Sequence, residues 1–274
     1  MTDPITNNRR TLYVIVPVLN EAPNLPRLFN AFQRLQSAYP DYDKQIILID
    51  DGSTDDTASV ARELGSKLQL TVISHDGNRG PGYAFGTAFA FLADRLRNDD
   101  WVLTLEGDNT SRLELLSQMF HRADEGYDVI LASPYLYGGG IVNTVPLRVL
   151  LSKAANLFVK EILGLEGLVT VSSFYRLYRG SAILALQRIY GERIIERTGF
   201  ECMVEMLMKM VFLHTSISEV AMVLDSSVRI GKSKMKIMRT MRGYLALYRQ
   251  MDAWKSRSTH VGVANTMIGH QTVS

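Results

Sequence analysis

Short apolar segments with the length of β-strands alternate with helix-like segments through the first half of the chain. The predicted strands lie near residues 12–17, 45–50, 69–74, 101–105 and 128–133. Between the first two, Leu25, Leu28 and Phe32 recur at helical spacing. Strands that alternate with helices across short connections are typical of a mostly parallel sheet with helices on both faces. The sequence therefore predicts an α/β fold.

The pattern changes after residue 133, and the C-terminal quarter is basic. Helices are predicted at 146–163, 180–190 and 199–213, and extended segments at 173–178 and 217–224. Residues 229–250 contain seven Lys or Arg and no acidic residue. We expect four parts along the chain: a disordered N-terminus (1–10), an α/β domain (11–226), a basic flap with an amphipathic helix (227–252) and a flexible tail (253–274).

Composition excludes several classes of protein. Cys202 is the only cysteine, which leaves no disulfide framework and no thiolate cluster for zinc. A net charge of +2 gives no indication of a nucleic-acid partner, and we predict none. The start of the chain is polar, and the apolar stretch 83–93 is shorter than the roughly 18 residues that span a bilayer. We expect a cytoplasmic protein that meets any membrane from its inner face.

The first acidic cluster, Asp50-Asp51-Gly52-Ser53, follows a predicted strand. Asp, Gly and Ser are common in turns, so a plain strand-to-helix turn is one interpretation. Two adjacent carboxylates repel each other, however, and a turn needs only one. Carboxylates are good acceptors for the donor groups of a nucleotide base or ribose. We therefore expect Asp50 and Asp51 to bind a nucleoside.

The second cluster is Glu106-Gly107-Asp108, which follows the apolar strand 101–105. An acidic first turn that complements a helix dipole is the simpler interpretation. Alternate acids at a strand end can also turn toward one cation, and Mg²⁺ or Mn²⁺ prefers carboxylate oxygens shared with substrate phosphates. Because parallel strands end at the same edge of a sheet, both clusters should open into one crevice. Glu106 and Asp108 are the predicted metal ligands.

The segment 78–86 contains three glycines but departs from the dinucleotide-binding pattern, because its third glycine falls one position late. Gly80, Ala84 and Ala88 recur every four residues, which favours close packing of a helix on the sheet. Asn78 and Arg79, at the start of this helix, remain predicted nucleotide contacts.

The basic run 229–236 interleaves glycine and serine with cations. It could be a solvated loop or a mobile flap that closes over phosphates. The following segment places Met241, Tyr244 and Tyr248 on one side, with arginines around them. That side could face the protein core or lie on an anionic membrane, and both interpretations stay open.

Several of these motifs follow one another as in a known family. They are the segments 16–21, 49–55, 78–80 and 106–108, followed by Arg148, 173–176, 199–201 and 229–234. Over about residues 12–245 the chain resembles family 2 glycosyltransferases of the GT-A fold. It is most similar to the polyprenyl-phosphate mannose and glucose synthases within that family. The resemblance implies that residues 11–226 form a GT-A catalytic domain.

The resemblance also implies a function and its residues. The expected reaction is an inverting transfer of a hexose from UDP- or GDP-hexose, with Mg²⁺ or Mn²⁺ as cofactor. The implied nucleotide-binding residues are Pro17, Asn20, Glu21, Asp50, Asp51, Ser53, Asn78, Arg79 and Gly107. The implied phosphate-binding residues are Arg148, Arg229, Lys232 and Lys234. The implied catalytic residues are Asp108, Glu201 and Arg148.

Three positions depart from the synthases that the chain resembles. Glu106 replaces their first metal-binding aspartate, Pro134 replaces an arginine, and Thr170 replaces an aspartate. Loss of that arginine removes a charge-assisted bond to an acceptor phosphate. The acceptor is therefore either a lipid phosphate, such as a polyprenyl phosphate, or a soluble hydroxyl compound, such as a glycan or secondary metabolite.

A hydroxyl acceptor requires a general base, for which Glu201 and Asp108 are the candidates. A non-catalytic nucleotide-sugar-binding protein is the remaining alternative. The sequence is compatible with peripheral membrane contact and with a homodimer, and it fixes neither.

Overall fold

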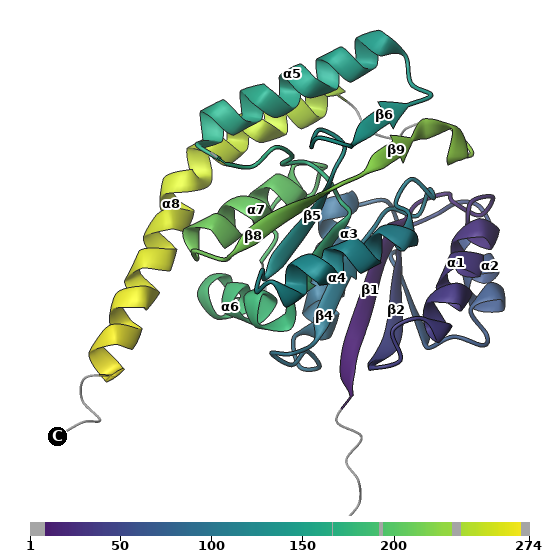
Figure 1. The fold of residues 1–274 in the computed structure, drawn as a ribbon, viewed down its shortest axis with the longest axis horizontal. Coiled ribbons are helices and arrows are strands. Elements are labelled where there is room, and N and C mark those ends of the chain that lie inside the picture. The colour runs from purple at the N-terminus through teal and green to yellow at the C-terminus, as the bar shows by residue number, and fades with distance from the viewer. Residues whose placement is uncertain (1–8, 166, 192–193, 232–236, 270–274) are drawn as a thin grey trace, which may run out of the picture.

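The computed structural model describes residues 9–165, 167–191, 194–231 and 237–269 (Figure 1). Its main sheet has the strand order β3-β2-β1-β4-β7-β5-β8. These strands are β1 (Arg10–Val18), β2 (Tyr42–Asp50), β3 (Leu70–Ser74), β4 (Trp101–Thr104), β5 (Val129–Ser133), β7 (Arg176–Arg179) and β8 (Ile217–Ala221). All neighbours pair in parallel except β7, which runs antiparallel to β4 and β5. The predicted α/β fold and its five N-terminal strands are confirmed.

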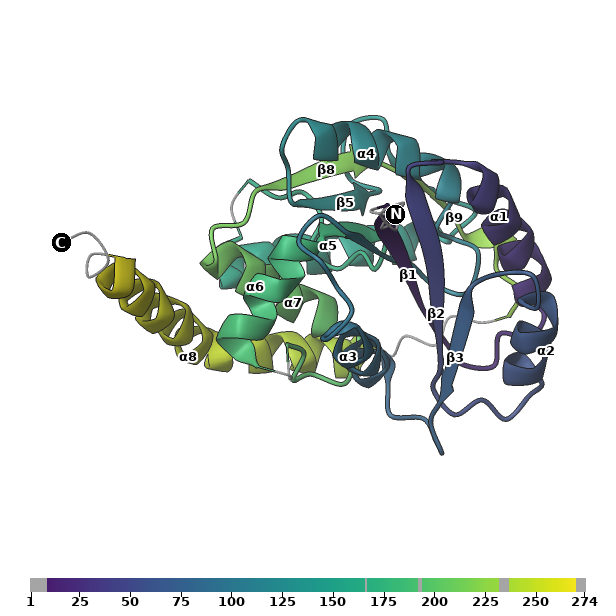
Figure 2. The same cartoon turned by 90° about the horizontal axis from the view of Figure 1, so that it is seen from below.

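Helices cover both faces of this sheet (Figure 2). One face packs against α1 (Leu25–Ser37), α2 (Thr57–Leu64), the 3₁₀ turn η1 (Leu113–Leu115) and α4 (Leu116–Asp124). The other face packs against α3 (Pro81–Leu92), α6 (Gly180–Tyr190) and α7 (Cys202–Phe212). Along β1, Val14 and Val16 join the first core, whereas Tyr13 and Ile15 join the second. A strand buried on both faces is apolar at every position, which explains the continuous run in the sequence.

The C-terminal half adds a smaller sheet and two long helices. Strands β6 (Gly140–Val142) and β9 (Val223–Asp225) pair in parallel, and β9 leads into the 3₁₀ turn η2 (Ser226–Val228). Helix α5 (Pro146–Leu163) lies beside α8 (Ile237–Gly269), and α8 also packs on α6 and α7 (Figure 1). In the described part, no helix is both long enough and apolar enough to cross a membrane.

The prediction of a flexible tail from residue 253 is wrong for residues 253–269, which continue α8. Trp254 is 1% exposed, so burial of this side chain against the core anchors the helix just past residue 252. Of the N-terminus predicted to be disordered, residues 1–8 lie outside the described residues, and Arg10 already begins β1.

Strand register brings the two acidic clusters to one edge of the sheet. Val18 pairs with Asp50, and Ile15 pairs with Thr104. The loops that follow β1, β2 and β4 therefore leave the sheet side by side at its carboxyl edge. Open α/β sheets bind ligands at this edge, and the cavity described next lies there.

Candidate active site

A cavity of about 520 Å³ opens at the carboxyl edge of the sheet. Its first wall carries residues from the loops that were predicted to bind nucleotide and metal, namely Pro17, Glu21, Asp51, Asn78, Arg79, Glu106, Gly107 and Asp108. Its second wall comes from α5, the 170–175 segment, the 198–201 segment and Tyr244 of α8. Arg229, which follows β9 and η2, also lines the cavity. The structure thus brings most of the predicted residues together.

Asp51 fixes the turn that precedes α3. Its buried carboxylate accepts hydrogen bonds from the backbone N–H groups of Arg79, at 3.0 Å, and Gly80, at 2.7 Å. His75 Nδ1 lies 2.8 Å from the same carboxylate. Gly80 has φ = +96°, a conformation that side chains rarely tolerate, and a Cβ there would overlap the carbonyl oxygen of Thr198. Asp51 thereby positions Asn78 and Arg79 at the cavity wall.

Asp50, Ser53 and Asn20 lie behind this wall rather than in it. The Asp50 carboxylate accepts from the Ser53 N–H at 3.0 Å, and Ser53 Oγ accepts from the Asn20 N–H at 2.8 Å. The Asn20 side-chain oxygen accepts from the Thr54 N–H at 2.7 Å. These contacts join the loops after β1 and β2. The three side chains therefore form hydrogen bonds within the loops and are not among the residues that line the cavity.

Glu106 and Asp108 share the hydroxyl of Thr110. Thr110 Oγ1 lies 2.6 Å from Asp108 Oδ1 and 3.3 Å from Glu106 Oε2. The other Asp108 oxygen, Oδ2, forms an ion pair with the guanidinium of Arg229. Burial, reinforced by the Asp108 charge, raises the pKa of Glu106 to about 8. A cation bound near two such close carboxylates would stabilise the ionised form of both.

The pair fits a divalent metal that a substrate helps to hold. Among the described residues, no group of three His, Cys, Asp or Glu side chains is placed to bind a metal. Two carboxylates suffice for Mg²⁺ or Mn²⁺ where substrate phosphates and water complete the shell. Gly107, between the two acids, packs so closely on Val18 that a Cβ would lie 2.6 Å from Val18 Cγ1. This packing holds the turn rigidly against β1.

Glu201 belongs to the second wall. The residue is 6% exposed, and its carboxylate lies 3.4 Å from Arg197 Nε and packs against Gly243 of α8. The predicted catalytic carboxylate is therefore in the cavity, but it is held by a cation and by a neighbouring helix.

Arg176 organises the loop next to this wall. It is fully buried, and its guanidinium donates to the carbonyl oxygens of Ser173, Val171 and Met203 at 2.7 Å each. Arg176, the last residue of the motif 173–176, therefore holds the backbone of these segments in place. It joins the 171–173 segment to the start of α7.

The departures at Pro134 and Thr170 also line this part of the cavity. Thr170 is 1% exposed, its hydroxyl lies 2.5 Å from Ser133 Oγ, and its N–H donates to Glu219. Pro134 follows Ser133 directly at the end of β5. The Thr170 hydroxyl is thus hydrogen-bonded within the protein. Neither Thr170 nor Pro134 carries a charge that could bind an acceptor.

Three predicted phosphate ligands have no described side chain. Arg148 lies in the first turn of α5, with its side chain outside the description, and Lys232 and Lys234 lie outside the described residues. Sequence reasoning overlooked Thr110 and His75, which hold the acidic residues in place. The only signal for Thr110 was its position two residues after Asp108.

Comparisons with known proteins were made for both sequence and fold. The glycosyl transferase family 2 profile matches residues 13–184. A polyprenol monophosphomannose synthase of Mycolicibacterium smegmatis is 34% identical over 182 residues, which cover 65% of this chain and 65% of the relative. An undecaprenyl-phosphate mannosyltransferase of Micrococcus luteus is 27% identical over 222 residues, covering 81% of this chain and 86% of the relative.

A solved structure with a similar fold is glucosyl-3-phosphoglycerate synthase of Mycobacterium tuberculosis, in complex with Mn²⁺, UDP and glucosyl-3-phosphoglycerate. It superposes with a TM-score of 0.57 at 19% identity, covering 91% of this chain and 80% of that one. The similarity supports the GT-A type of fold.

Proposed function

The chain belongs to glycosyl transferase family 2, and from this premise we propose that it transfers a hexose from UDP- or GDP-hexose to a polyprenyl phosphate. The observation that carries the proposal is one continuous cavity. It joins an acidic pair suited to a metal diphosphate to a wall of α5 that includes Val149, Ala155 and Val159. The names of the two sequence relatives support a polyprenyl phosphate as acceptor.

The donor would lie along the first wall. Glu106 and Asp108 would hold Mg²⁺ or Mn²⁺, which when bound supplies a Lewis acid to the departing diphosphate. Arg229 would move its guanidinium from Asp108 to the diphosphate, a group that binds arginine strongly. Asp51 would keep Asn78 and Arg79 at the edge of the nucleotide. Gly107 lets the turn between the two acids pack closely on Val18.

The transfer itself would be a single in-line displacement. An acceptor oxygen forms a bond to the anomeric carbon while the bond from that carbon to the diphosphate breaks, and the electron pair leaves with the diphosphate. The configuration of the sugar is therefore inverted. A phosphate acceptor is already ionised near neutral pH, so the step needs no general base. Glu201 would then serve to shape the acceptor wall.

The same donor chemistry with a soluble hydroxyl acceptor is the second candidate. It is favoured by the carboxylate of Glu201 in the second wall and by the uncharged residues Pro134 and Thr170, which line the same cavity. A hydroxyl must lose its proton, and a buried carboxylate near the acceptor could take it. In this case Glu201 would be the base.

An exposed apolar face on α5 and α8 supports a lipid acceptor. Residues on this face have between 44% and 63% of their surface exposed: Leu147, Leu150, Leu157, Phe158, Leu245 and Tyr248. The opposite face of α5 lines the cavity through Val149, Asn156 and Val159. Exposed Lys153 and Arg249 flank the apolar residues. This combination fits the surface of an anionic bilayer, from which a lipid phosphate could enter the cavity.

The decisive experiment offers radiolabelled UDP- and GDP-hexoses with Mn²⁺ to the purified protein. Undecaprenyl phosphate in anionic vesicles is one acceptor, and a panel of soluble glycans is the other. Label that moves to the organic-soluble lipid supports the first proposal, and label that moves to a glycan supports the second. Nucleotide binding without transfer to either acceptor class would contradict both.

A further inference from the structure

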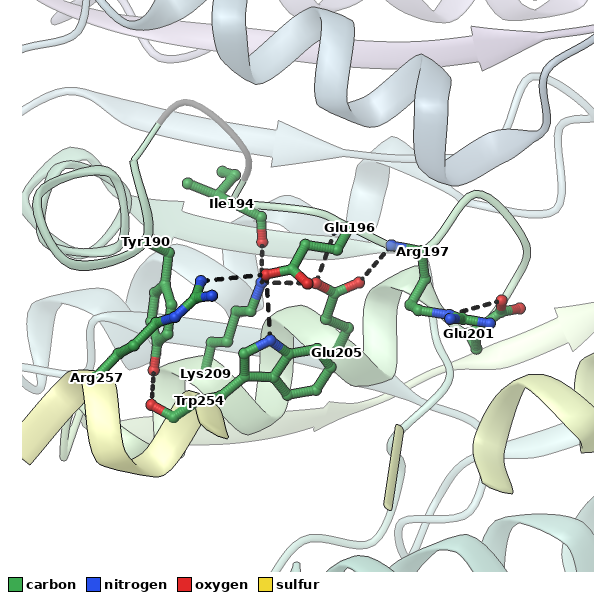
Figure 3. Close-up of polar contacts among 9 residues, drawn as sticks. All are labelled: Tyr190, Ile194, Glu196, Arg197, Glu201, Glu205, Lys209, Trp254 and Arg257. Atoms are coloured by element: carbon green, nitrogen blue, oxygen red, sulfur yellow. Dashed lines mark hydrogen bonds and ion pairs between the residues drawn. The ribbon is translucent and has the colours of Figure 1, made fainter. Parts of the chain in front are cut away.

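A buried ion pair lies on α7, outside the cavity and apart from the proposed chemistry. All residues from Cys202 to Met210 are buried, and within this run Glu205 and Lys209 carry charge in an otherwise apolar segment. Their side chains are fully buried, and Lys209 Nζ lies 2.6 Å from Glu205 Oε1 (Figure 3). Burying two charges costs desolvation energy, and two apolar residues of similar size often stabilise a core equally well. The pair therefore calls for a reason other than stability.

The pair binds the backbone of the segment that precedes α7. The Glu205 carboxylate accepts from the N–H groups of Glu196 and Arg197, both at 2.8 Å. Lys209 Nζ donates to the Ile194 carbonyl oxygen at 3.0 Å. Residues 194–198 belong to no helix or strand, so these three bonds replace a regular hydrogen-bond pattern. Backbone groups without such partners would be costly to bury.

This segment connects directly to the candidate active site. The Thr198 carbonyl oxygen accepts from the Gly82 N–H at 2.9 Å, at the start of α3. A Cβ at Gly82 would overlap the carbonyl oxygen of Arg197, so the two backbones are in close contact. Glu201 follows three residues after Thr198 and lines the cavity.

Helix α8 closes the pair from its other side (Figure 3). Lys209 Nζ lies 4.7 Å from the ring centre of Trp254 and 4.9 Å from that of Tyr190. The Trp254 indole N–H donates to the Glu196 carboxylate at 3.2 Å, and Arg257 lies 3.6 Å from the same group. The rings of Trp254 and Tyr190 therefore cover Lys209.

We propose that Glu205 and Lys209 are positioning residues that fix the 194–201 segment, and with it the Glu201 carboxylate, relative to the nucleotide turn before α3. The pair acts through the backbone of residues 194–197, and it touches neither donor nor acceptor. The turnover part of this claim rests on the proposed function. Its structural part does not.

The test replaces the pair by apolar residues of similar size, Glu205→Leu with Lys209→Met. We expect the double variant to fold with a lowered thermal midpoint, because three backbone groups of residues 194–197 lose their partners. Glu196 keeps its ion pair with Arg257, so no buried charge is left unpaired. Hydrogen exchange at the amides of residues 196 and 197 should accelerate at least about tenfold. The kcat should fall at least about tenfold, while the donor KM changes less than about threefold because Asp51 holds the nucleotide turn independently.

A folded double variant with unchanged exchange and unchanged kcat would overturn the proposal. If the double variant does not fold, Glu205→Gln serves instead, since it keeps the side-chain volume and one acceptor oxygen. It should speed exchange at one of the two amides and lower kcat by about threefold, and no change in either would overturn the proposal. Arg179→Gln is the control, because its ion pair with Asp128 ties β7 to β5 away from the cavity.

Failure of the proposed function gives a different result. A wild type without transferase activity, combined with faster amide exchange in the variant, refutes the function and supports the positioning role. Binding of UDP with Mn²⁺ then replaces turnover as the second measurement.

Discussion

Arg229 and Asp108 form an ion pair inside the cavity, although 121 positions separate them in the chain. Asp108 is a proposed metal ligand, and Arg229 is a proposed ligand of the diphosphate. In the structure, Arg229 therefore pairs with the carboxylate that would bind the metal, and Asp108 pairs with the cation that would bind the diphosphate. Binding of a metal diphosphate would replace this ion pair by two others: Asp108 with the metal, and Arg229 with the diphosphate.

Arg229→Gln should separate metal binding from nucleotide binding. Without the competing guanidinium, Asp108 should bind Mn²⁺ alone about tenfold more tightly, since a hydrogen bond to a charged group contributes about 1.5–3 kcal/mol. Binding of UDP or GDP in the presence of Mn²⁺ should weaken, because the diphosphate loses a cation. Electron paramagnetic resonance of free Mn²⁺ and calorimetry with nucleotide measure the two effects.

The control is Arg112→Gln, whose partner Asp225 lies 3.8 Å away and does not line the cavity. It should leave both affinities unchanged. Mn²⁺ affinity that is equal in the wild type and in Arg229→Gln would show that the ion pair does not compete with the metal.

Two glycines near the start of α3 should respond to alanine in opposite directions. Gly80→Ala forces a side chain into a φ of +96° and against the Thr198 carbonyl, so we expect a loss of at least about 2 kcal/mol in the free energy of unfolding. Gly86 lies within α3 with no atom within 4 Å of an added Cβ. Gly86→Ala should stabilise by up to about 1 kcal/mol. Urea denaturation measures both, and equal stability of the two variants would contradict the described packing.

The exposed face of α5 and α8 should bind anionic membranes. Replacing Leu147 and Leu150 by serine removes two side chains that are more than 60% exposed, so the fold should remain intact. Each leucine that enters a bilayer contributes up to about 1.5–3 kcal/mol, and partial insertion of both should make vesicle binding at least about tenfold weaker in the variant. Flotation with phosphatidylglycerol vesicles measures this, with neutral phosphatidylcholine as control. Binding that is equal for wild type and variant would place the membrane contact elsewhere.

Cys202 should be unreactive in the folded protein. Burial, together with the charges of Glu205 and Glu201, raises the pKa of this thiol well above its ordinary value. Because the thiolate is the reactive form, a raised pKa lowers the reactive fraction at any given pH. A thiol reagent at pH 8 should therefore label Cys202 only as fast as the protein unfolds. Fast labelling without denaturant would contradict the burial of α7.

Much of the fold followed from local pattern. The strands β1, β2 and β4 are apolar on both faces because helices cover both faces of the sheet, so each appears as a short continuous run. The acids that end these strands could be assigned to one edge because parallel strands share their direction. Helix α5 was predicted at 146–163, the residues where it lies.

Contacts between distant segments could not be read from the sequence. The anchoring of α8 at Trp254 depends on contacts with Lys209 and Tyr190, which only the tertiary structure creates. Asp50 and Asp51 are adjacent and looked equivalent, yet Asp50 accepts from its own turn and Asp51 from the turn before α3. Glu205 and Lys209, two charges four positions apart in an apolar helix, were visible in the sequence as an anomaly and were overlooked.

The central claim is that Glu106 and Asp108 hold a divalent cation that in turn holds the diphosphate of a nucleotide. Calorimetry of UDP and GDP with the wild type and with Asp108→Asn, each with and without Mn²⁺, tests it most directly. We predict that one of the two nucleotides binds the wild type in a Mn²⁺-dependent manner. We also predict that Asp108→Asn reduces this affinity at least about tenfold, because the metal loses a charged ligand. Nucleotide binding that is unaffected by both Mn²⁺ removal and Asp108→Asn would contradict the account.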